Sequence, residues 1–301
     1  MNNLYTDING KTIDLSLLNF EQLQQLNYQE ETYFAQEIKK LVPFSKKRNL
    51  YLQKSYEKIM TIARYKRKFT KNNHNGVNNA TIDLVEEIID EFYQKKDQVL
   101  FYEAGVGTGY LLRSIVDEKI TILGCDVFLS KEAKSLNQQY FNITVVEDNL
   151  YDALDQVPDN SIDIFYADNV LEHIVDDEYE KTCEKIAQKI APGGIAIIII
   201  PNPYNGPHDI TKLNPKASKN GFQFKEQTFN QATATFFKYN LICRDFCFKN
   251  RKNSIIVIKH GVLLNRIKRL LEPLFRKQKK KGLRHLIFKR LGYDIYILRK
   301  K

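Results

Sequence analysis

Three glycines lie within five residues in the stretch EAGVGTG, at Gly105, Gly107 and Gly109. Glycine allows a positive φ and leaves room for a ligand against the main chain. Glu103 precedes this turn, where a carboxylate would repel a phosphate and attract a cation. Tyr110 stands where a dinucleotide site has its third glycine. The pattern therefore favours a nucleoside ligand that carries positive charge.

Two acids follow at spacings that suit the rest of such a ligand. Asp126 lies 21 residues after Gly105, at a position from which a carboxylate accepts hydrogen bonds from a ribose diol. Asp148, in EDN (147–149), is placed to reach an adenine edge. Either acid alone is explained as well by an exposed surface position. Both acids together with the glycine turn, and no phosphate-binding lysine, indicate S-adenosylmethionine (SAM).

Histidine is the usual side chain for taking up a proton near neutral pH. Two of the five histidines follow predicted strands of the site, His173 in LEHI and His208 in GPHDI. Asp209, beside His208, could orient or assist it. A structural hydrogen bond explains His173 equally well, and a surface loop position is the alternative for His208. No spacing of His, Cys, Asp and Glu indicates a metal site.

The elements that must position these residues alternate along the chain. Apolar runs predict strands over 99–105, 120–127, 143–150, 162–171 and 194–202, with helical patterns between them. Such alternation predicts parallel strands covered on both faces. Two more runs, 241–248 and 254–261, are joined by a short polar turn, which predicts a hairpin. The expected fold is α/β: a doubly wound, mostly parallel seven-stranded sheet with a C-terminal antiparallel hairpin, Rossmann-like.

The flanks of this sheet domain, expected over 80–261, have a different character. Residues 1–79 are expected to form a helical extension or cap, because apolar residues recur at spacings of three and four from Glu21 to about Phe69. Pro43 interrupts this pattern, and a polar loop over 71–80 ends it. Thr81 then predicts the N-cap of the next helix.

The net charge of +10 comes from the C-terminal segment, residues 262–301, which holds 14 Lys/Arg and two acids. The remaining residues hold 32 Lys/Arg and 34 acids, which excludes a uniformly basic nucleic-acid-binding body. Apolar residues from Leu263 to Phe275 recur at helical spacing, which predicts a basic amphipathic tail. Such a tail could lie on an anionic membrane, bind nucleic acid or pack on the body. Packing on the body is the commonest role of such a stripe, and the mixture of aliphatic and aromatic residues with the charges favours the membrane over nucleic acid.

Other features of the sequence bear on location. The longest purely apolar run, 195–200, is too short to cross a bilayer. The first residues lack the pattern of a signal peptide. The four cysteines show neither zinc nor CxxC spacing, which favours reduced thiols. The expected location is cytoplasmic, with peripheral contact at the inner face of the membrane. The sequence predicts no oligomeric state.

These motifs, in this order, resemble those of the class I SAM-dependent methyltransferases. The matching motifs cover roughly residues 80–260 and are EAGVGTG (103–109), GCDV (124–127), VEDNL (146–150), DNVLEHI (168–174) and APGGIAIIIIPNP (191–203). NVLEHI together with APGG is most similar to the small-molecule and lipid-associated subset. PNPYNGPHDITK resembles the acceptor loop of bacterial enzymes that modify glycans or secondary metabolites.

The resemblance implies roles for the residues of the glycine turn and the first acid. Glu103 would lie near the sulfonium or amino end of SAM. Gly105, Gly107 and Gly109 would let the backbone approach the methionine and ribose. Asp126 would bind the ribose hydroxyls.

The resemblance also implies roles for residues further along the chain. Val127 would pack on the adenine, and Asp148 would accept a hydrogen bond from the adenine amino group, with the amide of Asn149 nearby. Asp168 or Asn169 would close the site under the methionine end.

The implied activity is methyl transfer from SAM to a small-molecule or glycan/lipid-linked acceptor, with oxygen as the expected atom. One alternative is an RNA or DNA methyltransferase that uses the basic tail. Another is a SAM-binding module without catalysis, against which the intact glycine turn, Asp126 and Asp148 argue.

Overall fold

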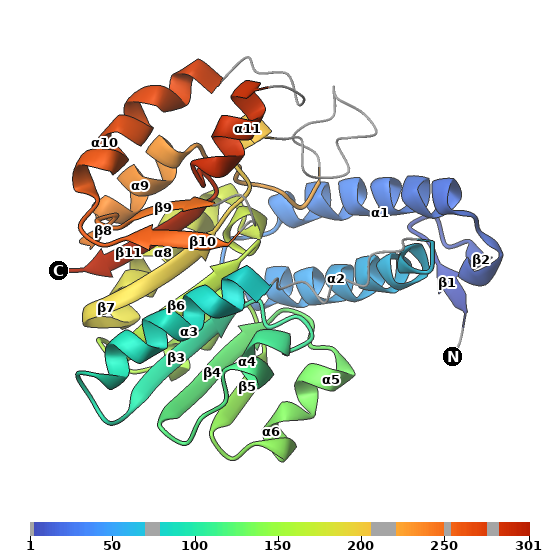
Figure 1. Ribbon diagram of the computed structural model, residues 1–301. Helices are drawn as coiled ribbons and strands as arrows, with labels where there is room; N and C mark the ends of the chain where they lie inside the picture. Colours follow the sequence, from blue (N-terminus) through green and yellow to red (C-terminus); the bar gives the residue numbers. More distant parts are fainter. Residues whose placement is uncertain (1–2, 70–78, 206–220, 250–253, 276–282) are drawn as a thin grey trace. The chain divides into compact units, whose positions relative to one another are not determined.

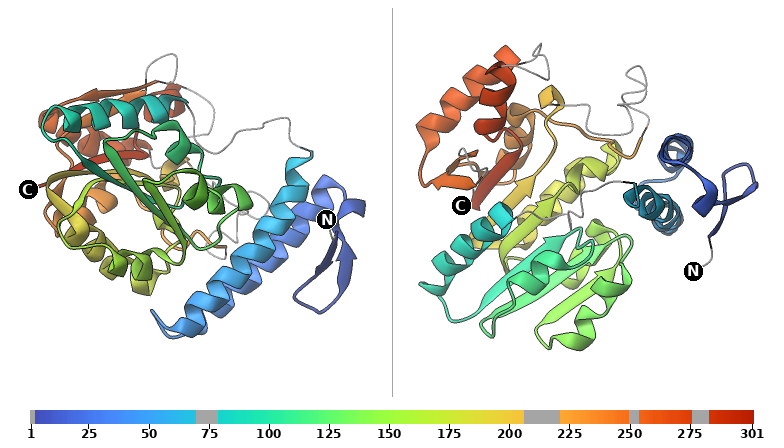
Figure 2. Two further views of the ribbon diagram at one scale, coloured as in Figure 1. Left: turned by 90° about the horizontal axis from the view of Figure 1, so that it is seen from below. Right: turned by 45° about the vertical axis from the view of Figure 1, so that its right-hand side comes forward.

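The computed structural model describes residues 3–69, 79–205, 221–249, 254–275 and 283–301. The chain divides into two compact units (Figures 1 and 2). Unit 1 comprises Met1–His74 and Pro207–Phe224, and unit 2 comprises Asn75–Gly206 and Lys225–Lys301.

Unit 1 contains a small hairpin and two long helices. Its elements are β1 (Leu4–Thr6), β2 (Thr12–Asp14), η1 (Leu15–Leu17), α1 (Phe20–Lys40) and α2 (Lys46–Arg67). The fully buried carboxylate of Glu30 in α1 accepts hydrogen bonds from the Tyr5 hydroxyl at 2.6 Å and the Ile8 amide at 2.7 Å. These bonds fasten the hairpin to α1. The predicted N-terminal helices are confirmed.

Unit 2 is built on a seven-stranded sheet in the order β5-β4-β3-β6-β7-β11-β8. The strands are β3 (Val99–Ala104), β4 (Ile120–Asp126), β5 (Ile143–Glu147), β6 (Ile162–Asp168), β7 (Ile190–Ile199), β8 (Leu241–Ile242) and β11 (Ile295–Lys300). Neighbours from β5 to β7 pair in parallel, whereas β11 runs antiparallel to both β7 and β8. The strand order reverses beside β3, and ligands of open α/β sheets bind at such a point. The predicted fold class is confirmed.

Helices cover both faces of this sheet (Figures 1 and 2). The helices are α3 (Asn79–Tyr93), α4 (Tyr110–Ser114), α5 (Lys131–Lys134), α6 (Leu136–Gln139), α7 (Leu150–Ala153), α8 (Asp176–Lys189) and α9 (Phe229–Phe237). Successive residues of β6 supply opposite faces, as a strand requires. Phe165 lies in the core cluster with α8 and α9, and Tyr166 lies in the cluster with α3. Both faces of β6 are therefore core.

The antiparallel strand of the sheet does not come from the predicted hairpin. The hairpin does form, from β9 (Phe246–Lys249) and β10 (Ile255–Ile258), but it is a separate two-stranded sheet. The antiparallel strand is β11, in the segment expected to be a tail. Its residues Ile295–Leu298 are all fully buried. The Lys and Arg residues that flank this short apolar run conceal it in the sequence.

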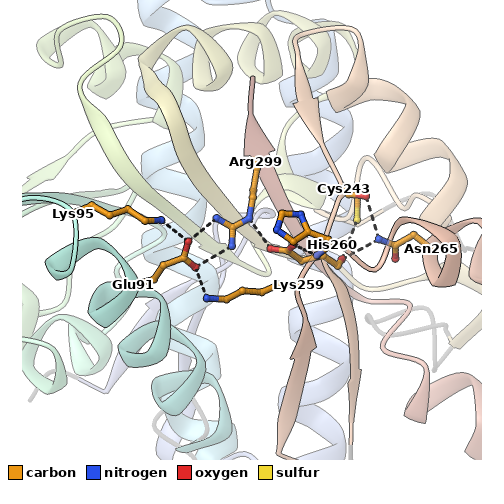
Figure 3. A network of polar contacts seen from close by, with 8 residues as sticks. Glu91, Lys95, Cys243, Lys259, His260, Asn265 and Arg299 are labelled. Atoms are coloured by element: carbon orange, nitrogen blue, oxygen red, sulfur yellow. Dashed lines mark hydrogen bonds and ion pairs between the residues drawn. The ribbon is translucent and has the colours of Figure 1, made fainter.

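A network of ion pairs holds β11 in place (Figure 3). The Arg299 guanidinium donates to both carboxylate oxygens of Glu91 in α3, each at 3.0 Å, and to Asp245 at 2.7 Å. Lys95 and Lys259 also pair with Glu91. These contacts hold the pKa of the Glu91 carboxyl well below its usual range, with the Arg299 hydrogen bonds as the largest cause. Arg299 thereby joins β11, α3 and the loop before β9.

Three short helical elements precede β11: α10 (Val262–Leu271), η7 (Glu272–Phe275) and α11 (Leu283–Arg290). Phe275, Phe288 and Tyr293 pack together against the same core cluster as α9. Within the described residues, no helix has the length and apolar composition needed to cross a membrane.

The start of α3 also differs from expectation. The predicted N-cap at Thr81 is wrong, because α3 begins at Asn79 and Thr81 lies buried within it. Ala80 has a high helix propensity and allows the helix to begin earlier.

Candidate active site

The glycine turn connects β3 to α4 at the switch point of the sheet. Gly105, Gly107 and Gly109 have φ angles of 75°, 58° and 72°, which favour glycine. A Cβ at Gly105 would also collide with Val170, whereas a Cβ at Gly107 would meet no atom within 4 Å. Packing and backbone conformation thus require glycine at 105. At 107 only the backbone does, and the space beside it is open.

Asp126 ends β4 and reaches back to this turn. Its Oδ2 accepts a hydrogen bond from the Gly107 amide at 2.9 Å, and its Oδ1 accepts from the Phe128 amide at 3.1 Å. Burial raises the pKa of Asp126, while these backbone hydrogen bonds lower it. Val127, which follows, is partly exposed. The structure therefore brings the predicted ribose acid and the glycine turn into direct contact.

Glu103 lies near the end of β3 and is 3% exposed. Among the described residues, its Oε2 atom has no hydrogen-bond partner. Burial raises the pKa of this carboxyl well above its usual range, and the nearby charges of Asp126 and Asp168 raise it further. Glu103 is thus a buried acid near two other acids, and its Oε2 accepts no hydrogen bond from the described residues. Such a carboxyl is suited to a cationic ligand.

Asp168 ends β6, next to β3 in the sheet. It accepts hydrogen bonds from the Tyr166 hydroxyl at 3.2 Å and from the Asn169 amide group at 2.6 Å. Burial raises the pKa of Asp168 to about 6. Asn169 is exposed and has a φ of 54°, in the left-handed region that Asn tolerates. The hydrogen bond to Asp168 already occupies one donor of the Asn169 side-chain amide.

Asp148 and Asn149 follow β5. The Asp148 amide donates to the Asp126 carbonyl at 3.0 Å, so the two loops are joined. Asn149 is the N-cap of α7, since its Oδ1 accepts from the Asp152 amide at 3.0 Å. The predicted adenine-side acid lies beside the predicted ribose acid, and Asn149 has a structural task that sequence reasoning missed.

His173 lies in a short 3-10 helix, η3 (Leu171–His173), that follows β6. Its Nε2 is 3.9 Å from Oε1 of Glu172, and its side chain is 31% exposed. Glu172 itself is fully buried, and neither carboxylate oxygen accepts a hydrogen bond among the described residues. Burial raises the pKa of Glu172 to about 8.

Sequence reasoning missed Glu172. The available signal was its position in LEHI, directly before a histidine and after a buried leucine. The burial of its carboxyl follows from tertiary packing and is not visible in that pattern.

The remaining candidates lie elsewhere. His208 and Asp209 fall outside the described residues, as does His74, and the side chain of His285 is not described either. The His260 amide donates to Asp245 at 3.1 Å in the network of Figure 3, and His260 is not among the site residues. No group of three or more His, Cys, Asp or Glu side chains in the described part of the chain could hold a metal ion.

Residues 102–198 match the family model of a methyltransferase domain. This range runs from the end of β3 through β7 and holds the glycine turn, the three strand-end acids and the Glu172–His173 pair. The chain carries a class I SAM-dependent methyltransferase domain, and the protein is a SAM-dependent methyltransferase. The predicted methyltransferase family, enzyme class and cofactor are confirmed, whereas the predicted bacterial subset remains a prediction.

Comparison with curated proteins finds no match. Solved structures include a SAM-dependent methyltransferase from Archaeoglobus fulgidus, 16% identical over 73% of this chain and 94% of that chain, with a TM-score of 0.44. Another is 1,6-didemethyltoxoflavin-N1-methyltransferase from Burkholderia thailandensis, 11% identical over 87% and 93% of the two chains, with a TM-score of 0.42. Likenesses at this level do not indicate an acceptor.

The residues at the site fit SAM as methyl donor. The sulfonium and ammonium groups of SAM are cations, and the unpartnered, buried oxygen of Glu103 lies in a set of acids that would attract them. The open space beside Gly107 borders the Asp126 carboxylate, which suits a diol.

Proposed function

We propose that this enzyme methylates a hydroxyl group of a small-molecule or glycan/lipid-linked acceptor. The observation that carries the proposal is the pair formed by His173 and the buried carboxyl of Glu172, on the loop that follows β6. A hydroxyl must lose its proton as it is methylated, and this pair can take up that proton.

The cofactor residues are assigned as follows in this proposal. Glu103 attracts the cationic end of SAM, and Asp168 or Asn169 closes the site under the methionine. Asp126 accepts hydrogen bonds from the ribose. The backbone of Gly105, Gly107 and Gly109 borders the ligand, Val127 packs on the adenine, and Asp148 with Asn149 lies at its edge. SAM, when bound, supplies a methyl group activated by a sulfonium.

Glu172 sets the basicity of His173. An ionised carboxylate that lies 3.9 Å from an imidazole favours the protonated form of that imidazole, and burial strengthens the interaction. His173 is the stronger base when Glu172 is ionised. The half-buried imidazole also remains accessible to an acceptor. His208 and Asp209 stay in the proposal as a second candidate base.

A lipid-linked acceptor is presented at a membrane surface. The proposal therefore includes peripheral contact of the C-terminal segment, residues 262–301, with that surface.

The test is a labelled-methyl transfer assay on cell lysate fractionated into nucleic acid, lipid, polysaccharide and small molecules. His173→Gln should lower turnover by about 10²- to 10⁴-fold and leave SAM affinity unchanged. His260→Asn is the matched control. His260 is not among the site residues, and its backbone amide makes the hydrogen bond to Asp245, so this variant should retain turnover. Label in the nucleic-acid fraction would contradict the proposal and favour the RNA or DNA alternative.

The pH profile tests the pairing itself. Turnover should rise as pH rises toward about 8, since ionisation of Glu172 makes His173 the stronger base. Glu172→Gln should remove this rise. An unchanged profile in that variant would show that Glu172 does not act through His173.

A further inference from the structure

The helix α10 carries most of its apolar side chains on the outside. Eight of the nineteen exposed large hydrophobic side chains among the described residues lie between positions 262 and 287. They are Val262, Leu263, Ile267, Leu270, Leu274, Leu283, Leu286 and Ile287. Leu270 is 79% exposed and Leu263 is 69% exposed. We refer to these eight side chains as the outer apolar surface; Figure 1 shows α10 and α11 at the periphery of unit 2.

The opposite side of the same segment is polar and buried. Asn265 donates to the Cys243 and Asp245 carbonyls at 3.1 and 3.0 Å. The Lys268 ammonium donates to the Gly292 carbonyl at 2.6 Å and lies 4.1 Å from the centre of the Phe229 ring. The helix is thus attached to the domain through its polar residues.

Glu272 completes this attachment at the end of α10. Its carboxylate accepts hydrogen bonds from the Phe229 and Asn230 amides at 2.5 and 2.9 Å, and from the Asn202 side chain at 2.9 Å. It therefore satisfies free amides at the start of α9.

These polar contacts exclude a simple rotation of α10 that would bury its leucines. Such a rotation would break the buried hydrogen bonds of Asn265, Lys268 and Glu272, and unpartnered buried charges are costly. The orientation that exposes the apolar side chains is therefore the one that the buried polar residues specify. Exposed large apolar side chains concentrated in one segment of a folded domain, rather than scattered singly, indicate a contact site.

The charge of the segment identifies the partner. Arg266, Arg284 and Lys289 are exposed among the apolar side chains, and the sequence between Phe275 and Leu283 reads RKQKKKG. Residues 262–301 carry 14 Lys/Arg and two acids. Aliphatic side chains combined with exposed basic ones are what an anionic membrane interface binds, through apolar insertion and attraction to lipid headgroups.

We infer that the outer apolar surface of α10, η7 and α11 inserts into the interface of a membrane that contains anionic lipid. This inference rests on the proposed function for its lipid-linked acceptor and goes beyond it by assigning the contact surface and the class of lipid. The occupant is a lipid surface because both the aliphatic and the basic side chains are used, whereas nucleic acid would use only the charges.

The experiment is co-sedimentation of the full chain with phosphatidylcholine vesicles that contain or lack phosphatidylserine. The protein should pellet with the anionic vesicles, and less so at high salt. Leu263→Ser/Leu270→Ser should weaken this binding by at least about tenfold. Phe141→Ser is the matched control, since Phe141 is 91% exposed and lies outside the segment, and it should bind vesicles normally.

Three results would overturn the inference: equal binding to neutral vesicles, a salt-sensitive shift of RNA or DNA without vesicle binding, or an oligomer that the double variant dissociates. SAM affinity is measured on each variant to show that it is folded. If the double variant no longer binds SAM, Arg266→Glu replaces it. Arg266→Glu should also weaken binding to anionic vesicles. Failure of the proposed function has a different signature. It would appear as absent methylation of lipid or glycan fractions while vesicle binding persists.

Discussion

Two groups of acids in unit 2 have opposite environments. At the carboxyl ends of the parallel strands, Glu103, Asp126 and Asp168 all have raised pKa values, chiefly because of burial. The described residues place no Lys or Arg within ion-pair distance of these three acids. Around Arg299, by contrast, Glu91 has cationic partners on three sides, and its pKa is lowered.

Under the proposed function, the difference separates acids that hold the fold together from acids that bind the cofactor. Around Arg299 the chain supplies the cation itself, for both Glu91 and Asp245. Under the proposed function, the cofactor supplies the balancing charge for the acids at the carboxyl ends of the strands. Perturbed acids of the second kind concentrate at functional sites because their charge must be used in binding or catalysis.

The largest effect is expected from breaking the structural group. Arg299→Ala would leave Glu91 and the buried carboxylate of Asp245 without their shared cation. We expect the free energy of unfolding to fall by about 3–5 kcal/mol, measured by urea denaturation. Lys95→Ala is the control, because Lys95 is 59% exposed, and should cost less than about 1 kcal/mol. Equal losses in the two variants would refute the assignment of Arg299 as the central cation.

The next effect concerns the ligand-binding group. Asp126→Ala should weaken SAM binding by about 2–3 kcal/mol, because it removes a charged acceptor of hydrogen bonds. Isothermal titration calorimetry measures this directly. Asp97→Ala removes an exposed acid just before β3 and should leave affinity unchanged. If SAM bound Asp126→Ala as tightly as the unaltered protein, Asp126 would not be the ribose ligand.

Acids with raised and with lowered pKa values should also give opposite pH dependences of stability, and Glu172 and Glu91 provide the comparison. Glu172 has a native pKa of about 8, above its unfolded value, so its native carboxyl holds a proton that the unfolded chain has lost. Its stabilising contribution is therefore lost as pH rises, by about 1.4 kcal/mol per pH unit between roughly pH 5 and pH 7. The contribution of Glu91, whose pKa is lowered, is present above its unfolded pKa and is lost as pH falls. Urea denaturation of the ligand-free protein and of Glu172→Gln across this pH range measures how the free energy of unfolding changes with pH in each. The difference between the two slopes is the contribution of Glu172. Equal slopes would contradict the raised pKa of Glu172.

The smallest expected effect on stability is that of Glu103→Gln. Burial raises the pKa of Glu103 and so favours its uncharged form, and an uncharged amide of similar shape should therefore change stability by less than about 1 kcal/mol. SAM affinity should nevertheless fall, because the bound cation would favour the ionised form. A loss of stability as large as that of Arg299→Ala would place Glu103 in the structural group instead.

The sheet and the strand-end acids could be predicted from the sequence because both depend on local patterns. The runs that form β3 to β7 are apolar and alternate with helical segments, and parallel strands bring their ends to one edge. The sequence could not reveal β11, since a short apolar run between basic residues resembles a surface segment until its neighbours β7 and β8 are known.

The orientation of α10 was likewise beyond sequence reasoning. Periodicity predicts that a helix has an apolar side and a polar side, and the usual inference places the apolar side inward. Here the partners of Asn265, Lys268 and Glu272 lie on α9 and on loops distant in the sequence. Tertiary contacts alone decide which side faces the domain.

The position of β11 between β7 and β8 governs the order in which the protein can fold during synthesis. β8 ends at Ile242 and β11 begins at Ile295, yet in the sheet β8 pairs only with β11. As the chain leaves the ribosome, the edge of β7 therefore stays unpaired and β8 has no partner strand until β11 has been translated. Open strand edges attract other chains. In the interval between translation of β8 and of β11, the nascent chain therefore exposes a strand edge that another chain could pair with.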